Sequence, residues 1–326
     1  LAMIVLNNLF CSTQDVAIDS LAVSTLRENE RGRGNGFMFA GQYLGIALGG
    51  GGAVFVYGLF GFEATLTYIS ALLLLNLLFV LLYVRDPQAD PAAVRQADVL
   101  KKLVHSMVSF TRDVYAGFWK SGSGPMFGVL FSLLPTGAIA LQYATLGTIQ
   151  VDYGLNENQI AELRIYNTIT SALGCVVGGL LGDRIGVKKT VAMSYLLTAV
   201  PTLILAMEIT NGGLQSVPAG LFWGVIIAHG FFFGMAYGVR NAIFMGMTDP
   251  RVAATQFTAF MGMSNLAISM GNYWQGVVAE RFDYATVFYI DALFVLAVVL
   301  VIPFLRKREP RTVPPVATKV PATAES

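Results

Sequence analysis

Apolar residues form nine long runs in this chain, each bounded by polar or charged residues. A helix needs about 20 predominantly apolar residues to cross a hydrocarbon core of about 30 Å. The runs do not alternate between apolar and polar positions, which disfavours the strands of a membrane barrel. The pattern therefore predicts an all-α membrane protein with nine spanning helices, at residues 1–24, 35–57, 65–84, 126–149, 159–181, 187–208, 217–243, 252–278 and 285–305.

Basic residues gather in every second connection between these runs. They are Arg27, Arg31 and Arg33, then Arg85, Arg95, Lys101, Lys102, Arg112 and Lys120, then Arg184, Lys188 and Lys189, then Arg251, and finally Arg306, Lys307 and Arg308. The other connections carry mostly acids, with Arg281 their only base. Because Lys and Arg are retained on the cytoplasmic side, we expect a multi-pass protein of the inner (plasma) membrane with a cytoplasmic C-terminus.

The amino-acid composition argues against several classes of function. Hydrophobic residues make up 55% of the chain and charged residues 13%, while 21 basic against 20 acidic residues leave a net charge of +1. The net charge of the whole chain is therefore too small to attract nucleic acid. The two cysteines, Cys11 and Cys175, lie in apolar runs and predict neither a disulfide nor a metal site. No nucleophile, base and orienting group occur together, so we expect no enzyme and no cofactor.

Two segments of the chain resemble each other. Residues 37–51 align with 257–271 and Arg31 with Arg251, and YISAL at 68–72 matches YIDAL at 289–293. The first three spans thus correspond to the last three, and three helices between them lack a counterpart. We therefore expect a twelve-helix protein of two parallel halves, with three helices preceding Leu1, and a nine-helix chain that does not transport alone.

This repeat divides the chain into four parts. Residues 1–84 are the remnant of the N-terminal half (helices 4–6), 85–125 a cytoplasmic linker, 126–305 the C-terminal half (helices 7–12), and 306–326 a disordered tail. In the linker, apolar residues recur at helical spacing, at Leu103, Met107, Phe110, Val114 and Phe118. They predict a helix on the inner membrane surface, or alternatively a soluble linker helix with one apolar face.

Two carboxylates in the first span are the leading candidates for function. Asn8, Ser12, Asp15 and Asp19 share one helix face. A charged group near the bilayer centre costs about 3 kcal/mol, so this face is expected to border water or a partner. Asp15, the deeper of the two acids, can take up a proton and couple it to solute movement. Alternatively, Asp19 pairs with a cation such as Arg27 or Arg31 and latches a closed state.

Other polar residues within the spans are weaker candidates, each with a structural alternative. Arg164 can meet an anionic substrate or extend to the interface, and His229 can relay protons or bond between helices. Asp291 can contact substrate, or it can cap a helix or bond between helices. Gln142 and Asn265 are further candidates for a polar cavity wall. Gln14 lies on a different helix face from Asp15 and is a candidate either for the coupling site or for a bond between helices. Gly41, Gly45 and Gly49 form a stripe that predicts close helix packing.

Residues 179–189, GLLGDRIGVKK, resemble the G-x-x-x-D-R-x-G-x-K loop of major facilitator proteins. The matching residues are Gly179, Asp183, Arg184, Gly186 and Lys188, with Gly182 at the same turn. The resemblance implies a major facilitator helical bundle that works by alternating access on a small-molecule substrate in the lipid bilayer, most simply as a monomer. By residue type, the glycines permit a tight turn and Asp183 can cap or pair with a neighbouring helix end.

A second resemblance narrows the family. Residues 12–36, STQDVAIDSLAVSTLRENERGRGNG, are similar to a segment of the AmpG-type muropeptide permeases and related acetyl-CoA transporters. Gln14, Asp15 and Asp19 match its first part, and Glu30, Arg31, Gly32 and Gly34 its second. The resemblance implies proton-coupled symport of a muropeptide or similar amphiphilic anion. An acyl-CoA-type solute stays open as an alternative, as does a facilitator-like sensor or scaffold that moves nothing.

Overall fold

The computed structural model describes residues 2–84, 108, 111–112, 114–119, 123–134, 139–248 and 252–305. Within these ranges the ordered elements are helices, which confirms the all-α fold class. The helices are α1 (Ala2–Thr25), α2 (Arg31–Gly45), the π-helix η2 (Ile46–Gly52), α3 (Ala53–Tyr83), α5 (Ser123–Leu133), α6 (Leu146–Asp152), α7 (Glu157–Ile185), α8 (Val187–Gly212), α9 (Ala219–Met247), α10 (Ala253–Arg281) and α11 (Tyr284–Val301), with short turns η1 (Glu28–Glu30), η4 (Leu214–Ser216) and η5 (Ile302–Phe304).

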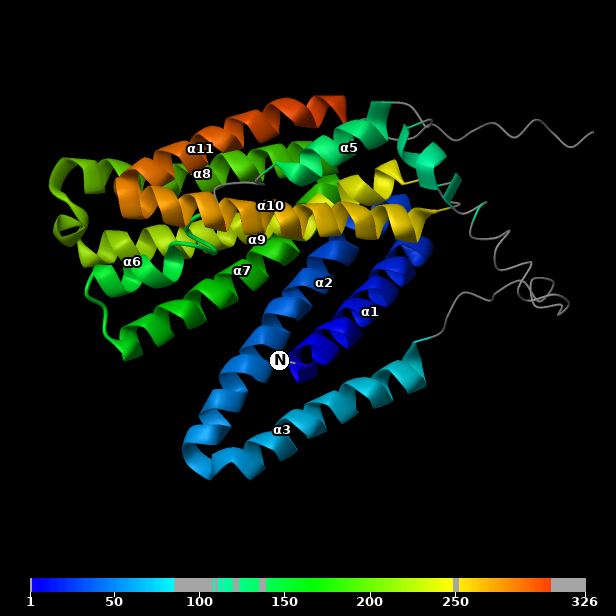
Figure 1. Cartoon of the computed structure of the whole chain (residues 1–326), viewed down its shortest axis with the longest axis horizontal. Helices are drawn as coiled ribbons and strands as arrows, with labels where there is room; N and C mark the ends of the chain where they lie inside the picture. Colours follow the sequence, from blue (N-terminus) through cyan, green and yellow to red (C-terminus); the bar gives the residue numbers. More distant parts are fainter. Residues whose placement is uncertain are drawn as a thin grey trace, which may run out of the picture.

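The molecule is built to lie in a membrane. Five continuous helical stretches of the described chain are long and apolar enough to cross one, and the first runs from Glu28 to Tyr83. That stretch contains the second and third predicted spans, which meet at Gly61, where the backbone adopts φ 80° and ψ −171°. A glycine adopts a positive φ without a steric penalty. The chain therefore reverses there, and Figure 1 shows α2 and α3 as the two arms of a V.

The fourth predicted span is not one helix, so the prediction of a continuous helix over 126–149 is wrong. α5 ends at Leu133 and α6 begins at Leu146, and residues 140–145 form turns between them. Tertiary hydrogen bonds replace the helical ones in this segment. The Ala140 N–H donates to Asp291 Oδ2 at 2.8 Å, and the Thr145 hydroxyl donates to the Ala140 carbonyl at 2.8 Å. A break inside a span is stable where the protein itself satisfies the backbone.

The centre of the bundle is the contact between α7 and α9. Glycines recur every four residues on both helices: Gly174, Gly178 and Gly182 on α7, and Gly230, Gly234 and Gly238 on α9. A side chain would overlap the opposite backbone at Gly174, Gly178, Gly234 and Gly238, and an opposite side chain at Gly182 and Gly230. Small residues let membrane helices approach closely, and polar side chains add hydrogen bonds between them. Here Ser171 donates to the Gly230 carbonyl at 3.0 Å.

The close packing predicted for the other glycine stripe is wrong for the described part of the chain. No described atom lies within 4 Å of a Cβ placed at Gly41, Gly45 or Gly49. The reason is that these glycines lie away from the face of α2 that carries Gly32, Gly36 and Phe39 to α7 and α9, and that α2 diverges from α7 towards its C-terminal end, as Figure 1 shows. The run of glycines instead forms the π-helical turn η2.

The linker is described only in part. Val114 packs against the main apolar cluster, and Phe118 is buried in it with its ring edge-on to Phe260 at 5.5 Å. Leu103, Met107 and Phe110 lie outside the described residues, as does the predicted tail at 306–326. The predicted helix on the membrane surface stays a prediction.

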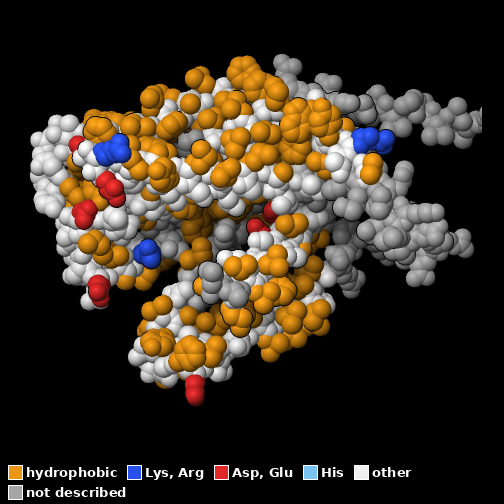
Figure 2. Space-filling model, in the orientation of Figure 1, with side chains coloured by type: hydrophobic (Ala, Val, Ile, Leu, Met, Phe, Trp, Pro, Cys, Tyr) orange, Lys and Arg blue, Asp and Glu red, His pale blue; other side chains and the backbone are white. Residues whose placement is uncertain are grey.

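Two groups of helices face each other across a crevice. α7, α8, α9, α10 and α11 pack together with α5, while α1 contacts α10 and α2 contacts α7 and α9. α3 lies apart and buries none of its residues. Figure 2 shows the resulting hollow between the α1–α3 group and the remaining helices, with acidic oxygens at its edge.

Candidate functional site

The two acids of α1 border this crevice from one side. Asp19 is 7% exposed, whereas Asp15, one turn earlier, is exposed. Both lie within electrostatic range of Tyr237 on α9, across the crevice. The carboxylates thus lie between the two helix groups, where a solute passing between the groups would meet them. Their role in proton coupling stays a prediction.

A buried arginine lies on α9, one turn from Tyr237. Arg240 on α9 is 2% exposed, and its Cζ lies 5.7 Å from the ring centroids of both Tyr237 and Phe244. At about 1.5 Å per residue, Arg240 lies about 10 Å from the end of α9 and Asp19 about 9 Å from the end of α1. Since both helix ends lie on the same side of the bundle (Figure 1), the cation and the carboxylate lie at similar depth.

Two half-buried tyrosines lie near Arg240 and a third lies near both of them; we call Tyr43, Tyr143 and Tyr237 the tyrosine cluster. Tyr143 and Tyr237 lie within electrostatic range of Arg240, and Tyr43 within range of both other tyrosines. The cluster draws one residue each from α2, from the turn segment 140–145 and from α9. It therefore joins both helix groups around one cation.

Two buried phenylalanines pack against this region. The Phe39 ring lies 4.3 Å from that of Tyr237, and the Phe233 ring lies 5.8 Å from both Tyr237 and Tyr143, centroid to centroid. Rings at such distances pack favourably in tilted or offset arrangements. The site therefore combines charges of both signs, phenol hydroxyls and aromatic faces, a set suited to an amphiphilic solute.

One end of the crevice is closed by the glycine-rich loop singled out in the sequence. Asp183 accepts hydrogen bonds from the backbone N–H groups of Gly32 at 2.9 Å and Arg33 at 3.0 Å, at the start of α2. The Arg33 Nε lies 4.0 Å from the same carboxylate. A carboxylate at a helix N-terminus satisfies unpaired donors and interacts favourably with the helix dipole. Asp183 therefore caps a helix of the opposite group, one of the two roles expected for it.

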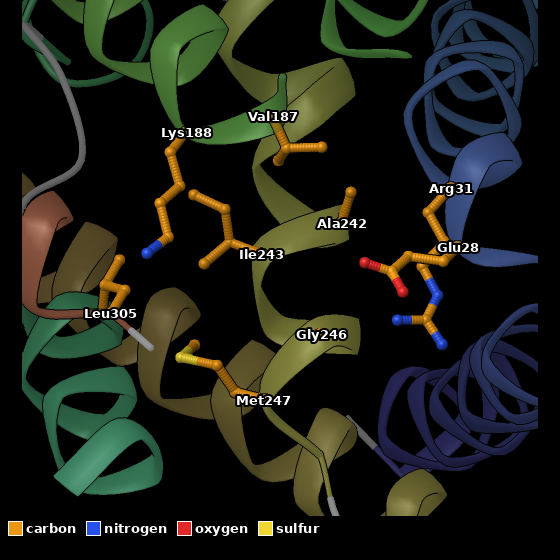
Figure 3. Close-up of a pocket in the computed structure, with 9 residues that line it drawn as sticks. All are labelled: Glu28, Arg31, Val187, Lys188, Ala242, Ile243, Gly246, Met247 and Leu305. Carbon is orange, nitrogen blue, oxygen red and sulfur yellow. The ribbon is translucent and has the colours of Figure 1, made fainter. Parts of the chain in front are cut away.

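Other contacts support the closure at this end. Arg31 donates from Nη1 to the Met245 carbonyl at 3.2 Å, which joins α2 to α9. A small cavity of about 50 Å³ lies here, with Glu28 and Arg31 on one side and Lys188 and Leu305 on the other, as Figure 3 shows. The alternative of a latch through Asp19 is not seen, because no ion pair joins Asp19 to Arg27 or Arg31 among the described residues.

The opposite end of the crevice is open. At the closed end, a Cβ on Gly36 would lie 2.6 Å from the Cys175 carbonyl. Towards its C-terminal end, α2 runs apart from α7, as Figure 1 shows. The two helices therefore diverge from a fixed contact. The crevice is therefore closed at the Asp183 end and open at the other end.

The remaining predicted site residues fall into two groups. Gln142, next to Tyr143, is half-buried near the tyrosine cluster, and the fully buried Asp291 holds the segment that carries both, since it binds Ala140 and also accepts from Gln275 Nε2 at 3.0 Å. Asp291 therefore acts between helices, as its structural alternative proposed. His229 is fully buried two turns from Tyr237, with its ring 6.1 Å from that of Phe233.

Three predicted site residues are exposed away from this cluster. Arg164 lies in the first turns of α7, far along that helix from Ser171 and Cys175, while Asn265 lies on α10 and Gln14 on α1. The structure does not bring them together with the tyrosine cluster.

Arg240 is absent from the residues predicted from sequence. It stands three residues before the predicted end of its span at 243, where an arginine commonly extends toward the interface. The structure continues α9 to Met247 and buries the side chain. The available signal was a single charge within an otherwise apolar run, which by default indicates function.

Comparisons with known proteins agree with this architecture. A family model described as Major Facilitator Superfamily matches residues 1–161 and 126–324. The chain is also similar to the anhydromuropeptide permeases of Escherichia coli strain K12 and of E. coli O157:H7, each 23% identical over 278 residues. The alignment covers 84% of this chain and 52% of each relative, so the chain spans about half the length of the curated relatives it matches.

The family model thus covers nearly all of the helices and the crevice described above. Apolar helices, a glycine-packed centre and the Asp183 loop are consistent with that match. The chain is a multi-pass membrane protein and belongs to the Major Facilitator Superfamily of transporters.

Proposed function

We propose that this chain carries the solute pathway of a proton-coupled secondary transporter of the inner membrane, which imports a muropeptide or similar amphiphilic anion by alternating access. The observation that carries the proposal is the pair of carboxylates, Asp15 and Asp19, beside a crevice that is closed at one end. Ionisable groups are retained within membrane spans chiefly where they serve transport or proton relay.

The proposed substrate rests on two further observations. The similar E. coli proteins are named anhydromuropeptide permeases. The tyrosine cluster, Phe39 and Phe233 offer ring faces and hydroxyls beside Arg240, which suits a solute with both apolar and anionic parts. The proposal includes the two-half organisation, with residues 1–84 and 126–305 as parts of opposite halves, 85–125 as their link, and a cytoplasmic C-terminus.

Uptake into proteoliposomes tests the proposal, using the complete reading frame that contains this chain. We expect labelled anhydromuropeptide to accumulate when the outer solution is made more acidic than the lumen, and a protonophore to abolish the accumulation. Accumulation of acetyl-CoA in place of the muropeptide would transfer the proposal to the acyl-CoA class. Counterflow of labelled solute distinguishes a transporter from a sensor, since a protein that only binds the solute exchanges nothing across the membrane.

A further inference from the structure

The proposed proton coupling gives no role to the buried guanidinium of Arg240. Arg240 is 2% exposed at the same depth as Asp19, and it lies beside two members of the tyrosine cluster. Removing a cation from water is costly, and such groups persist in membrane spans where they pair with charge or face a solute path.

We propose that Arg240 and the tyrosine cluster form the site that recognises a carboxylate of the transported solute. This inference rests on the proposed function and deepens it, because it assigns the anionic part of the substrate to a place in the crevice. Arginine presents a planar set of N–H donors that matches the two oxygens of a carboxylate, and it stacks on aromatic faces as Arg240 does on Tyr237. The phenol hydroxyls of Tyr43, Tyr143 and Tyr237 supply further donors for the same oxygens.

Two acids beside the crevice create a need for a nearby cation if the solute is an anion. Asp15 and Asp19 lie within electrostatic range of Tyr237 and would repel an anion while they are ionised. An anionic solute entering this region therefore needs a fixed cation at the same depth. Arg240 is that cation, and arrival of a proton together with the anion lowers the repulsion from α1.

The apolar neighbours fix where the rest of the solute lies. Phe39 and Phe233 are buried against Tyr237, with ring centroids 4.3 and 5.8 Å away, so apolar rings back this region on both helix groups. Pockets that bind small molecules combine such apolar walls with a few placed polar groups. A carboxylate held at Arg240 would leave the remaining part of the solute against these rings.

Variants of Arg240 in the complete reading frame test the inference, with uptake of labelled anhydromuropeptide and of its carboxyl-amidated analogue as the two readouts. We expect Arg240→Gln to raise KM for the anionic solute about 10- to 100-fold, the usual range for losing a hydrogen bond to a charged group. KM for the amidated analogue should change little. Arg240→Lys keeps the charge without the planar donors, so an intermediate KM is expected.

The matched control is Arg281→Gln, which removes an exposed arginine at the end of α10 and should leave both KM values unchanged. If Arg240→Gln is not recovered as a monodisperse protein, two other measurements test the inference. They are the KM values of Arg240→Lys and the selectivity of the parent for the anionic solute over its amide. Equal KM values of the parent for the two solutes, or unchanged selectivity in Arg240→Lys, overturn the inference while the proposed function stands. Failure of the parent to take up either solute overturns the proposed function and this inference with it.

Discussion

At the scale of single residues, the charges within the spans carry most of the functional information. Asp15 and Asp19 were recognisable from sequence because each stands in an apolar run and both share a helix face. Arg240 was not recognised from sequence, because it stands near the end of the predicted span while its helix continues beyond that end. How these charges are placed relative to one another depends on the packing of α1 on the distant α10, and no local pattern encodes that contact.

Neutralising Asp15 is expected to uncouple transport. A pH difference of about 1 unit supplies about 1.4 kcal/mol, enough for about tenfold accumulation per co-transported proton. In Asp15→Asn, the accumulation ratio driven by a pH step should fall to about 1 because the side chain no longer binds a proton, while counterflow continues. The measurement is uptake of labelled anhydromuropeptide into proteoliposomes holding the complete reading frame.

Glu63→Gln provides the control for this variant, because it removes an exposed acid outside the crevice and should leave accumulation intact. Asp19→Asn, which alters the more buried acid, completes the series. Accumulation in Asp15→Asn equal to that of the parent would remove Asp15 from the coupling mechanism.

At the scale of helices, the sequence best predicts the elements that depend on residues close together in the chain. Six of the predicted spans agree closely with single helices, for example 159–181 with α7 (Glu157–Ile185) and 187–208 with α8 (Val187–Gly212). The break in the fourth span was missed because the partners that stabilise it, Asp291 and Gln275, lie far along the chain. The glycine stripe at Gly41 looked like the packing surface, yet the glycines of α7 and α9 make the close contact. A repeat of small residues indicates close packing but does not identify its partner.

This difference between the two glycine stripes predicts a difference in stability. In Gly178→Ala the new methyl group would overlap the backbone of Met235 on α9, and overpacking of this kind typically costs about 1–3 kcal/mol. The apparent melting temperature of the detergent-solubilised protein should therefore fall. Gly41→Ala makes the same chemical change in open space and should leave the melting temperature unchanged. Equal melting temperatures for the two variants would show that the α7–α9 contact does not limit stability.

At the scale of the whole molecule, a fixed contact at one end and divergence at the other imply motion of one helix group against the other. The contact is made by short-range polar interactions at the start of α2, where Asp183 accepts from Gly32 and Arg33 and where Arg31 reaches Met245. Such short polar contacts can break without loss of the close α7–α9 packing, which lies within one group. Alternating access then requires this end to open while the other closes.

Locking the closed end should therefore arrest transport. Arg31 on α2 and Gly246 on α9 line the same cavity from opposite sides of the crevice, as Figure 3 shows. In Arg31→Cys/Gly246→Cys, built with Cys11→Ser to remove the exposed native thiol, a short bifunctional methanethiosulfonate should abolish uptake, and dithiothreitol should restore it. The control pair Val187→Cys/Gly246→Cys joins α8 to α9 within one group, lines the same cavity, and should keep transporting after cross-linking. Each pair is compared with its own uptake before the reagent, which removes any effect of the substitutions themselves. Undiminished uptake by the fully cross-linked Arg31→Cys/Gly246→Cys protein would mean that the solute crosses without separation of α2 from α9 at this end, and alternating access between these two groups would then be wrong.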